Sequence, residues 1–141
     1  MATYNKFNQF VQDVANKKHD LSADTLKVML SNTVPVATNS ILSDITEIAA
    51  GNGYTAGGTQ ATTTSSTQTA GTEKLIVADV VFTASGGSIG PFRYAVFYNA
   101  TQTSPNKPLI GWHDYGSSIS LNAGETFTWD ADQTAGILTI A

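Results

Sequence analysis

Over most of the chain, the pattern of hydrophobic and polar positions is that of β-strands. From residue 72 onward, segments rich in β-branched and aromatic residues are separated by short turn sequences. These segments are TEKLIVADVVFTA, PFRYAVFYNA, KPLIGWHDYG, SSISL, ETFTWDA and GILTIA. In the earlier segment TLKVMLSN, Leu26, Val28 and Leu30 alternate with Lys27 and Met29. A period of two predicts strands that bury one face.

The same pattern predicts a mainly β fold class. Short turns join successive strands and no helical segment lies between them, which disfavours a parallel sheet with crossover helices. We therefore expect an antiparallel β-sandwich or a jelly-roll-like barrel. A chain of 141 residues is long enough to form one domain, residues 1–141, around its own core.

The N-terminal segment, residues 1–22, has a helical period instead. Phe7, Phe10, Val11 and Val14 fall on one helix face, and Thr3 is a suitable N-cap. We predict one amphipathic helix here, whose apolar face packs on the domain or on a neighbouring chain. The segment SILSDITEIAA has a similar apolar stripe and allows a second, short helix.

The glycine-rich segment AAGNGYTAGG raises the question of a phosphate-binding loop. Gly51, Gly53 and Ala56 fit the dinucleotide pattern G-x-G-x-x-[GA], which requires a strand before it and a helix after it. Here the preceding segment reads as helical, and the following segment, GGTQATTTSSTQTAGT, lacks helix formers. The glycines therefore indicate a bend in the chain and no nucleotide site.

Residues 51–71 are then expected to form a long Gly/Thr-rich loop or an edge strand. A structureless connection of this length is uncommon in a compact domain and often has a binding role. Polar side chains of this segment and the apolar face of the N-terminal helix are the candidate partner contacts. They are Asn52, Tyr54, Thr55, Thr62 and Thr64, together with Phe7, Phe10, Val11 and Val14.

Composition removes several classes of function. The net charge is -4 and only 13% of residues are charged, so the chain offers no basic surface for nucleic acid. No continuous apolar stretch is long enough for a membrane span or a standard signal peptide. Cysteine is absent, which excludes thiolate catalysis and cysteine zinc sites.

One cluster of aromatic residues is a candidate ligand site. The segment GWHDYG contains Trp112, His113 and Tyr115, and Trp129 follows in ETFTWDA. These rings could stack on a sugar. Strand alternation gives a simpler interpretation, in which Trp112 and Asp114 face one way, His113 and Tyr115 face the other, and one pair is packed.

A catalytic role would need His113 beside a carboxylate or a metal ion. Asp114, Asp130 and Asp132 are the nearest carboxylates in the sequence, although a turn accounts better for the last two. Residues 116–118 read as a loop between two strands, and no nucleophile motif is present. His19, near the expected helix end, is predicted to be a solvated cap. We expect no catalytic residue, cofactor or metal.

Three stretches resemble small virion proteins of tailed bacteriophages: DTLKVMLSNTVPVATNSILSDITEIAAGNGYTAGG, GGSIGPFRYAVFYN and PLIGWHDYGSSISLNAGETFTWD. The resemblance runs from about residue 24 to the end and carries no catalytic motif. It implies a head decoration, or cement, protein that clamps neighbouring capsomers on the capsid surface. The implied partners are the major capsid protein and copies of this chain, with a trimer favoured, after synthesis in the host cytoplasm.

Two other functions stay open at this point. The first is a tail or baseplate component that binds a receptor or carbohydrate through Trp112, His113, Tyr115 and Trp129. The second is a small β-sandwich hydrolase built around His113. Exposure of the two tryptophans tests the first alternative, and the distance from His113 to the nearby aspartates tests the second.

Overall fold

The computed structural model describes residues 2–141, and the fold is mainly β with antiparallel sheets, as the sequence predicts. The strands are β1 (Thr3–Lys6), β2 (Leu26–Ser31), β3 (Thr59–Gln60), β4 (Thr63–Thr69), β5 (Thr72–Val77), β6 (Val80–Thr83), β7 (Ile89–Asn99), β8 (Leu109–Leu121), β9 (Thr126–Trp129) and β10 (Leu138–Ile140). The helical elements are α1 (Gln9–Ala15) and the 3-10 turn η1 (Leu42–Asp44).

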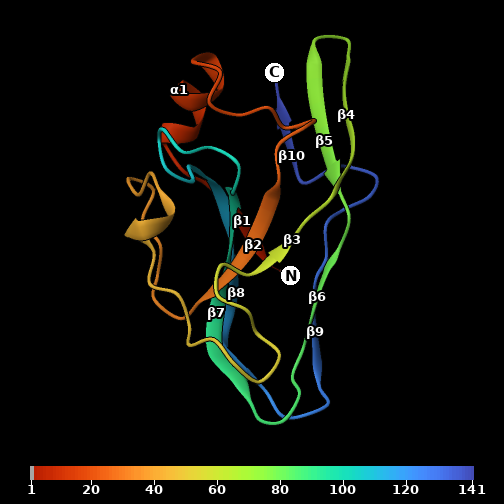
Figure 1. Ribbon diagram of the computed structural model, residues 1–141. Helices are drawn as coiled ribbons and strands as arrows, with labels where there is room; N and C mark the ends of the chain where they lie inside the picture. Colours follow the sequence, from red (N-terminus) through yellow and green to blue (C-terminus); the bar gives the residue numbers. More distant parts are fainter. Residues whose placement is uncertain (1) are drawn as a thin grey trace.

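The strands form two layers (Figure 1). One layer is a five-stranded sheet in the order β1-β8-β7-β2-β3. The other consists of a three-stranded sheet, β10-β5-β4, and a two-stranded sheet, β6-β9. Only two residues separate β5 from β6 in the chain. Strand β10 pairs with β5, and β9 pairs with β6, so the two sheets form one bent layer.

The main core lies between the layers. Val28 and Phe97 from the first sheet meet Leu75, Phe82 and Trp129 from the second, and all five side chains are buried. Alternate residues of each strand point into this core, which is the arrangement that a period of two produces. Burial of these large apolar side chains is the principal source of stability.

The outer face of the five-stranded sheet is also covered. Met29, Val96 and Trp112 form a second buried cluster there, and the connection between β2 and β3 lies over it through Leu42 and Ile45. The central strands are therefore buried on both faces. This corrects the expectation of a half-buried strand in TLKVMLSN, in which the period of two places Met29 on the polar side.

The predicted N-terminal helix over residues 1–22 is wrong in its extent. Thr3 does not cap a helix, because β1 pairs with β8 from Thr3 opposite Asp114 to Lys6 opposite Gly111. Strand pairing supplies backbone hydrogen bonds that override the local helical period. The helix begins only at Gln9.

The predicted apolar stripe is accordingly divided. Phe7 precedes α1 and belongs to the outer cluster, whereas Phe10 lies in the main core. Val14 packs partly against the main core, and Val11 is 55% exposed.

Two further local predictions need correction. The short second helix is only the turn η1, where Asp44 accepts hydrogen bonds from the backbone N–H groups of Ser40 and Ile41. Residues 116–118, expected to be a loop, lie inside β8. The register of β7 and β8 shifts between the pairs Phe92–Ile119 and Tyr94–Asp114, and residues 116–118 are the part of β8 that bulges there.

Residues 51–71 combine the two alternatives that the sequence allowed. Residues 51–58 form turns, whereas β3 and β4 follow as strands, and β4 is an edge strand of its sheet. Thr and Ser suit an extended, partly exposed strand.

The division of the stripe between two cores leads to a testable contrast. Phe7 is 0% exposed, so Phe7→Asp places a carboxylate among apolar side chains and should cost several kcal/mol of unfolding free energy. Val11→Asp, on the exposed face of α1, should change stability little. Chemical denaturation of both variants measures the difference, and equal midpoints would contradict the assignment of Phe7 to a core.

Candidate functional site

The glycine-rich segment forms a tight turn that is closed by two backbone hydrogen bonds. The N–H of Gly51 donates to the carbonyl of Tyr54 at 2.8 Å, and the N–H of Tyr54 donates back to Gly51 at 3.0 Å. Asn52 and Gly53 have φ angles of 55° and 98°, as a tight turn with two left-handed residues requires. No helix follows, so this segment is a bend, as predicted.

The strongest candidate site is a cleft of about 700 Å³ at the open side of the two layers, within the size range of small-molecule sites. Tyr4 of β1 and His113 and Tyr115 of β8 line it from the five-stranded sheet. Thr128 of β9 and Asp130 line it from the other layer, and Asp132, Gln133, Gly136 and Ile137 complete the wall.

A hydrogen bond between the layers fixes His113. The indole Nε1 of Trp129 donates to Nδ1 of His113 at 3.1 Å. Because an indole nitrogen can only donate, Nδ1 must be the unprotonated nitrogen, and the neutral ring carries its proton on Nε2. The ring also lies 5.3 Å from the Tyr4 ring, centre to centre.

Burial keeps the imidazole and the two phenols of this cleft neutral. Loss of hydration lowers the pKa of His113 to about 4 and raises the pKa of Tyr4 to about 12. Burial first, and the nearby Asp130 carboxylate second, raise the pKa of Tyr115. The imidazole and both phenols are therefore uncharged near pH 7.

The loop that forms the far wall is held in place by its own hydrogen bonds. Asp132 accepts the backbone N–H groups of Thr134 and Ala135 at 2.8 and 2.7 Å, which confirms the prediction of a turn here. These bonds lower the pKa of Asp132 and keep it ionised. Lys74 donates to the Thr134 carbonyl at 2.9 Å, which ties the loop to β5.

The structure separates the predicted stacking cluster. Trp112 and Trp129 are 8% and 0% exposed, in the outer cluster and the main core respectively. Only His113 and Tyr115 reach the cleft. The predicted alternation is confirmed, and neither indole offers a face on which a sugar could stack.

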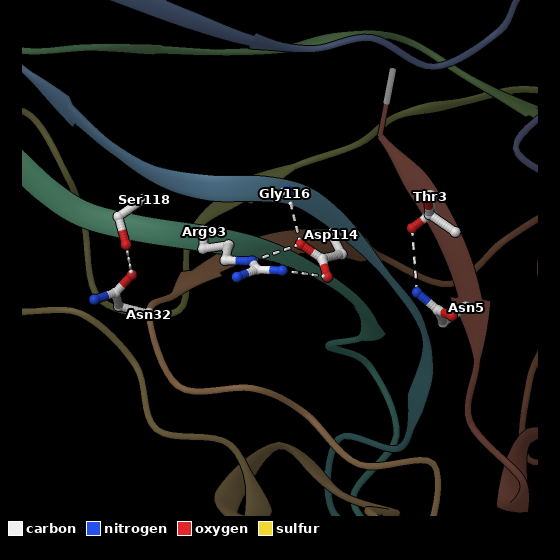
Figure 2. A network of polar contacts seen from close by, with 7 residues as sticks. All are labelled: Thr3, Asn5, Asn32, Arg93, Asp114, Gly116 and Ser118. Atoms are coloured by element: carbon white, nitrogen blue, oxygen red, sulfur yellow. Dashed lines mark hydrogen bonds and ion pairs between the residues drawn. The ribbon is translucent and has the colours of Figure 1, made fainter.

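The aspartates are also divided between two faces. Asp130 and Asp132 line the cleft with His113, as the hydrolase alternative requires. Asp114 lies on β8 but does not line the cleft; Arg93 of β7 binds it through two hydrogen bonds of 2.8 and 3.1 Å, and the N–H of Gly116 donates to it (Figure 2). This ion pair joins β7 to β8 where the register between the two strands shifts.

The geometry gives His113 no means of accepting a proton from a nucleophile. Its one lone pair, on Nδ1, is occupied by the Trp129 N–H, and Nε2 already carries a proton. Within residues 2–141, no group of three or more His, Cys, Asp or Glu side chains is arranged to hold a metal ion. In the same residues, no helix has the length and apolar character needed to cross a membrane.

The predicted partner contacts differ in accessibility. Phe7, Phe10 and Tyr54 are buried; the Tyr54 hydroxyl donates to Glu47 and accepts from the N–H of Leu30. The exposed candidates are Val11, Asn52, Thr55, Thr62 and Thr64.

His19 is not the solvated cap that the sequence predicts. Its ring lies 5.2 Å from that of Phe10, and its Nδ1 is 3.2 Å from the side-chain nitrogen of Asn99. Burial lowers the pKa of His19. Its Nε2 and one oxygen of the buried Asp13 have no hydrogen-bond partner among the described residues.

Sequence reasoning did not find Tyr4, Thr128, Gln133 or Ile137 as site residues. Tyr4 was assigned to a helix, and the others come together only through pairing of distant strands. For Thr128, one local feature of the sequence predicts that the side chain points away from the core: it directly precedes Trp129, and neighbouring residues of a strand point to opposite faces. Comparison of the chain with protein families, characterised proteins and solved structures gave no match.

The bend at Asn52 and Gly53 gives a stability prediction. A Cβ at Gly53 would overlap the carbonyl oxygen of Thr83, in addition to the roughly 1–2 kcal/mol that a left-handed conformation costs a non-glycine residue. Gly71 has a similar φ of 83° but open space around it. Gly53→Ala should therefore lower the unfolding free energy more than Gly71→Ala, as measured by chemical denaturation. Similar losses would mean that the close approach to Thr83 is unimportant.

The buried imidazole gives a pH prediction. Since the pKa of His113 falls from 6.5 to about 4 on folding, the unfolded chain binds more protons in this interval and stability falls as the pH drops from 6.5 to 4. The full shift corresponds to roughly 3 kcal/mol at 1.36 kcal/mol per pKa unit. His113→Gln keeps an acceptor for Trp129 but does not titrate, so its stability should depend less on pH. Equal pH profiles from denaturation at each pH would contradict this origin.

Proposed function

We propose that this protein is a non-enzymatic structural protein of a tailed-phage virion, which binds the outside of the assembled capsid and clamps neighbouring capsomers. The resemblance of residues 24–141 to small phage virion proteins supports the proposal. The occupied lone pair of His113 is also in keeping with the proposal, because the histidine of the cleft then cannot act as a general base.

The observation that carries the proposal is the free edge of β4. This strand, TTSSTQT, contains no charged residue, no proline and no fully buried side chain, and it is the end strand of its sheet. Figure 1 shows the β4 and β5 hairpin along one side of the molecule. Proteins commonly protect an exposed edge with lysine, proline or irregular pairing. Here the pairing is regular from Ser65 to Thr69.

An unprotected edge of this kind suits β-augmentation by a neighbouring chain. The unpaired N–H and C=O groups of β4 can continue the sheet into a coat subunit or a second copy of this protein. A trimer at a symmetry axis of the shell would present several such edges at once. The second and third contacts then form at high effective concentration, so binding is strong only to an assembled shell.

A lysine on this edge tests the contact. Thr69 is exposed and lies opposite Thr72, so Thr69→Lys should leave folding intact but weaken binding to capsids that lack the protein by about tenfold, or 1.4 kcal/mol, because strand pairing would desolvate the charge. Thr126→Lys, at an exposed position of β9 that also lies opposite a threonine, is the matched control and should bind normally. Sedimentation of each variant with undecorated capsids measures the difference. Equal binding by both variants would remove the β4 edge from the interface.

A cryo-EM map of the intact particle separates capsid decoration from the tail alternative. We expect density for this chain on the outer capsid surface, and particles lacking it should release DNA at lower temperature. Density confined to the tail or baseplate would reject the proposed position.

A further inference from the structure

We infer that the cleft between the two layers binds a neutral saccharide. The cleft presents donors, acceptors and aromatic rings from both sheets, and its lining contains no cationic side chain. This inference concerns the isolated chain and goes beyond the proposed role on the capsid, so either can fail without the other.

The donor is His113. Its Nδ1 is held by Trp129 at 3.1 Å, which leaves Nε2–H as the free donor of a ring that lines the cleft. Among residues 2–141, this N–H makes no hydrogen bond with a protein acceptor. The bond to Trp129 also fixes the orientation of the ring before any ligand arrives, which reduces the entropy cost of binding.

The principal acceptor is Asp130, which directly follows β9 and lines the cleft. Its carboxylate makes no hydrogen bond or ion pair with the described residues, so both oxygens are available. Two neighbouring hydroxyl groups can donate to one such carboxylate, and hydrogen bonds to charged acceptors are the stronger kind. Asp132, held by its turn, adds a second carboxylate on the same wall.

This combination selects the class of ligand. A bound anion would be repelled by Asp130 and Asp132, and a bound cation could not accept the proton of the His113 N–H. A hydroxyl group both donates and accepts, so a polyhydroxyl compound satisfies both sides. The rings of Tyr4 and Tyr115 offer apolar surface for the C–H groups of a pyranose. The ligand that meets all these conditions is a neutral sugar.

The walls of the cleft are largely preformed. The Tyr4 and His113 rings are neighbours across paired strands β1 and β8. On the other wall, Gln133 donates to the carbonyls of Val77 and Ala131 at 2.8 and 2.6 Å, which anchors the loop that carries Asp132. Rigid elements therefore supply the binding groups, as an efficient site requires.

The two tryptophan indoles provide the test. In ¹⁵N-resolved NMR of the full chain, we would titrate D-glucose, D-galactose, D-mannose, N-acetylglucosamine, maltose and lactose to millimolar concentrations. Binding should shift the Trp129 indole N–H, which is hydrogen-bonded to the ring that the ligand contacts. The Trp112 indole lies on the opposite face of the sheet and should not move. Choline and inorganic phosphate serve as the cationic and anionic comparisons.

Variants at exposed positions then locate the ligand without affecting the core. Asp130→Ala should weaken binding by about tenfold or more, since a charged acceptor is lost. Thr128→Val should weaken it as well, whereas Thr126→Val, two residues earlier on the same strand and outside the cleft, should not.

Three results would overturn the inference. The first is no shift of the Trp129 indole with any sugar of the panel. The second is a shift with choline or phosphate but not with sugars. The third is sugar binding that Asp130→Ala leaves unchanged, which would place the ligand elsewhere. None of these results bears on attachment through β4.

Discussion

The hydrogen bond from Trp129 to His113 is the interaction on which the rest of the structure depends. Trp129 is completely buried between the layers, and a buried indole N–H without an acceptor is costly. The acceptor comes from the opposite sheet, so the bond also joins the two layers near their open side. It fixes the protonated nitrogen of His113, and with burial it keeps that ring neutral.

The same bond explains why a polar cleft can border an apolar core. The Trp129 indole N–H and Nδ1 of His113 are hydrogen-bonded to each other, which leaves Nε2 as the nitrogen of His113 that is free to bind a ligand. The chain leaves the strand direction after β9, and the turn at Asp132 returns it to pair as β10 with β5. The residues of this loop, together with Tyr4 and Tyr115, line the cleft. The cleft thus borders the core at a residue pair that is hydrogen-bonded between the layers.

The sequence predicted the mainly β fold class, most strands, and the opposite orientations of Trp112 and His113, because strand alternation is a local property. It failed where distant pairing decides the conformation: Thr3 to Lys6 became a strand only because the edge of β8 was available. The Asn52-Gly53 pair, a strong local signal for a tight turn, was read only as a bend. The cleft was not predictable, since its walls come from strands at both ends of the chain.

The two proposed contact regions use different elements of the fold. In the order β10-β5-β4, β4 is an end strand, whereas the cleft is lined by β1, β8, β9 and the loop before β10. Pairing along β4 would use backbone groups, so it requires an uncharged, accessible strand but no particular side chains. Recognition in the cleft depends on fixed side chains, above all His113 and Asp130. Strand pairing along β4 would therefore use no group that lines the cleft, and the two kinds of contact do not compete for the same residues.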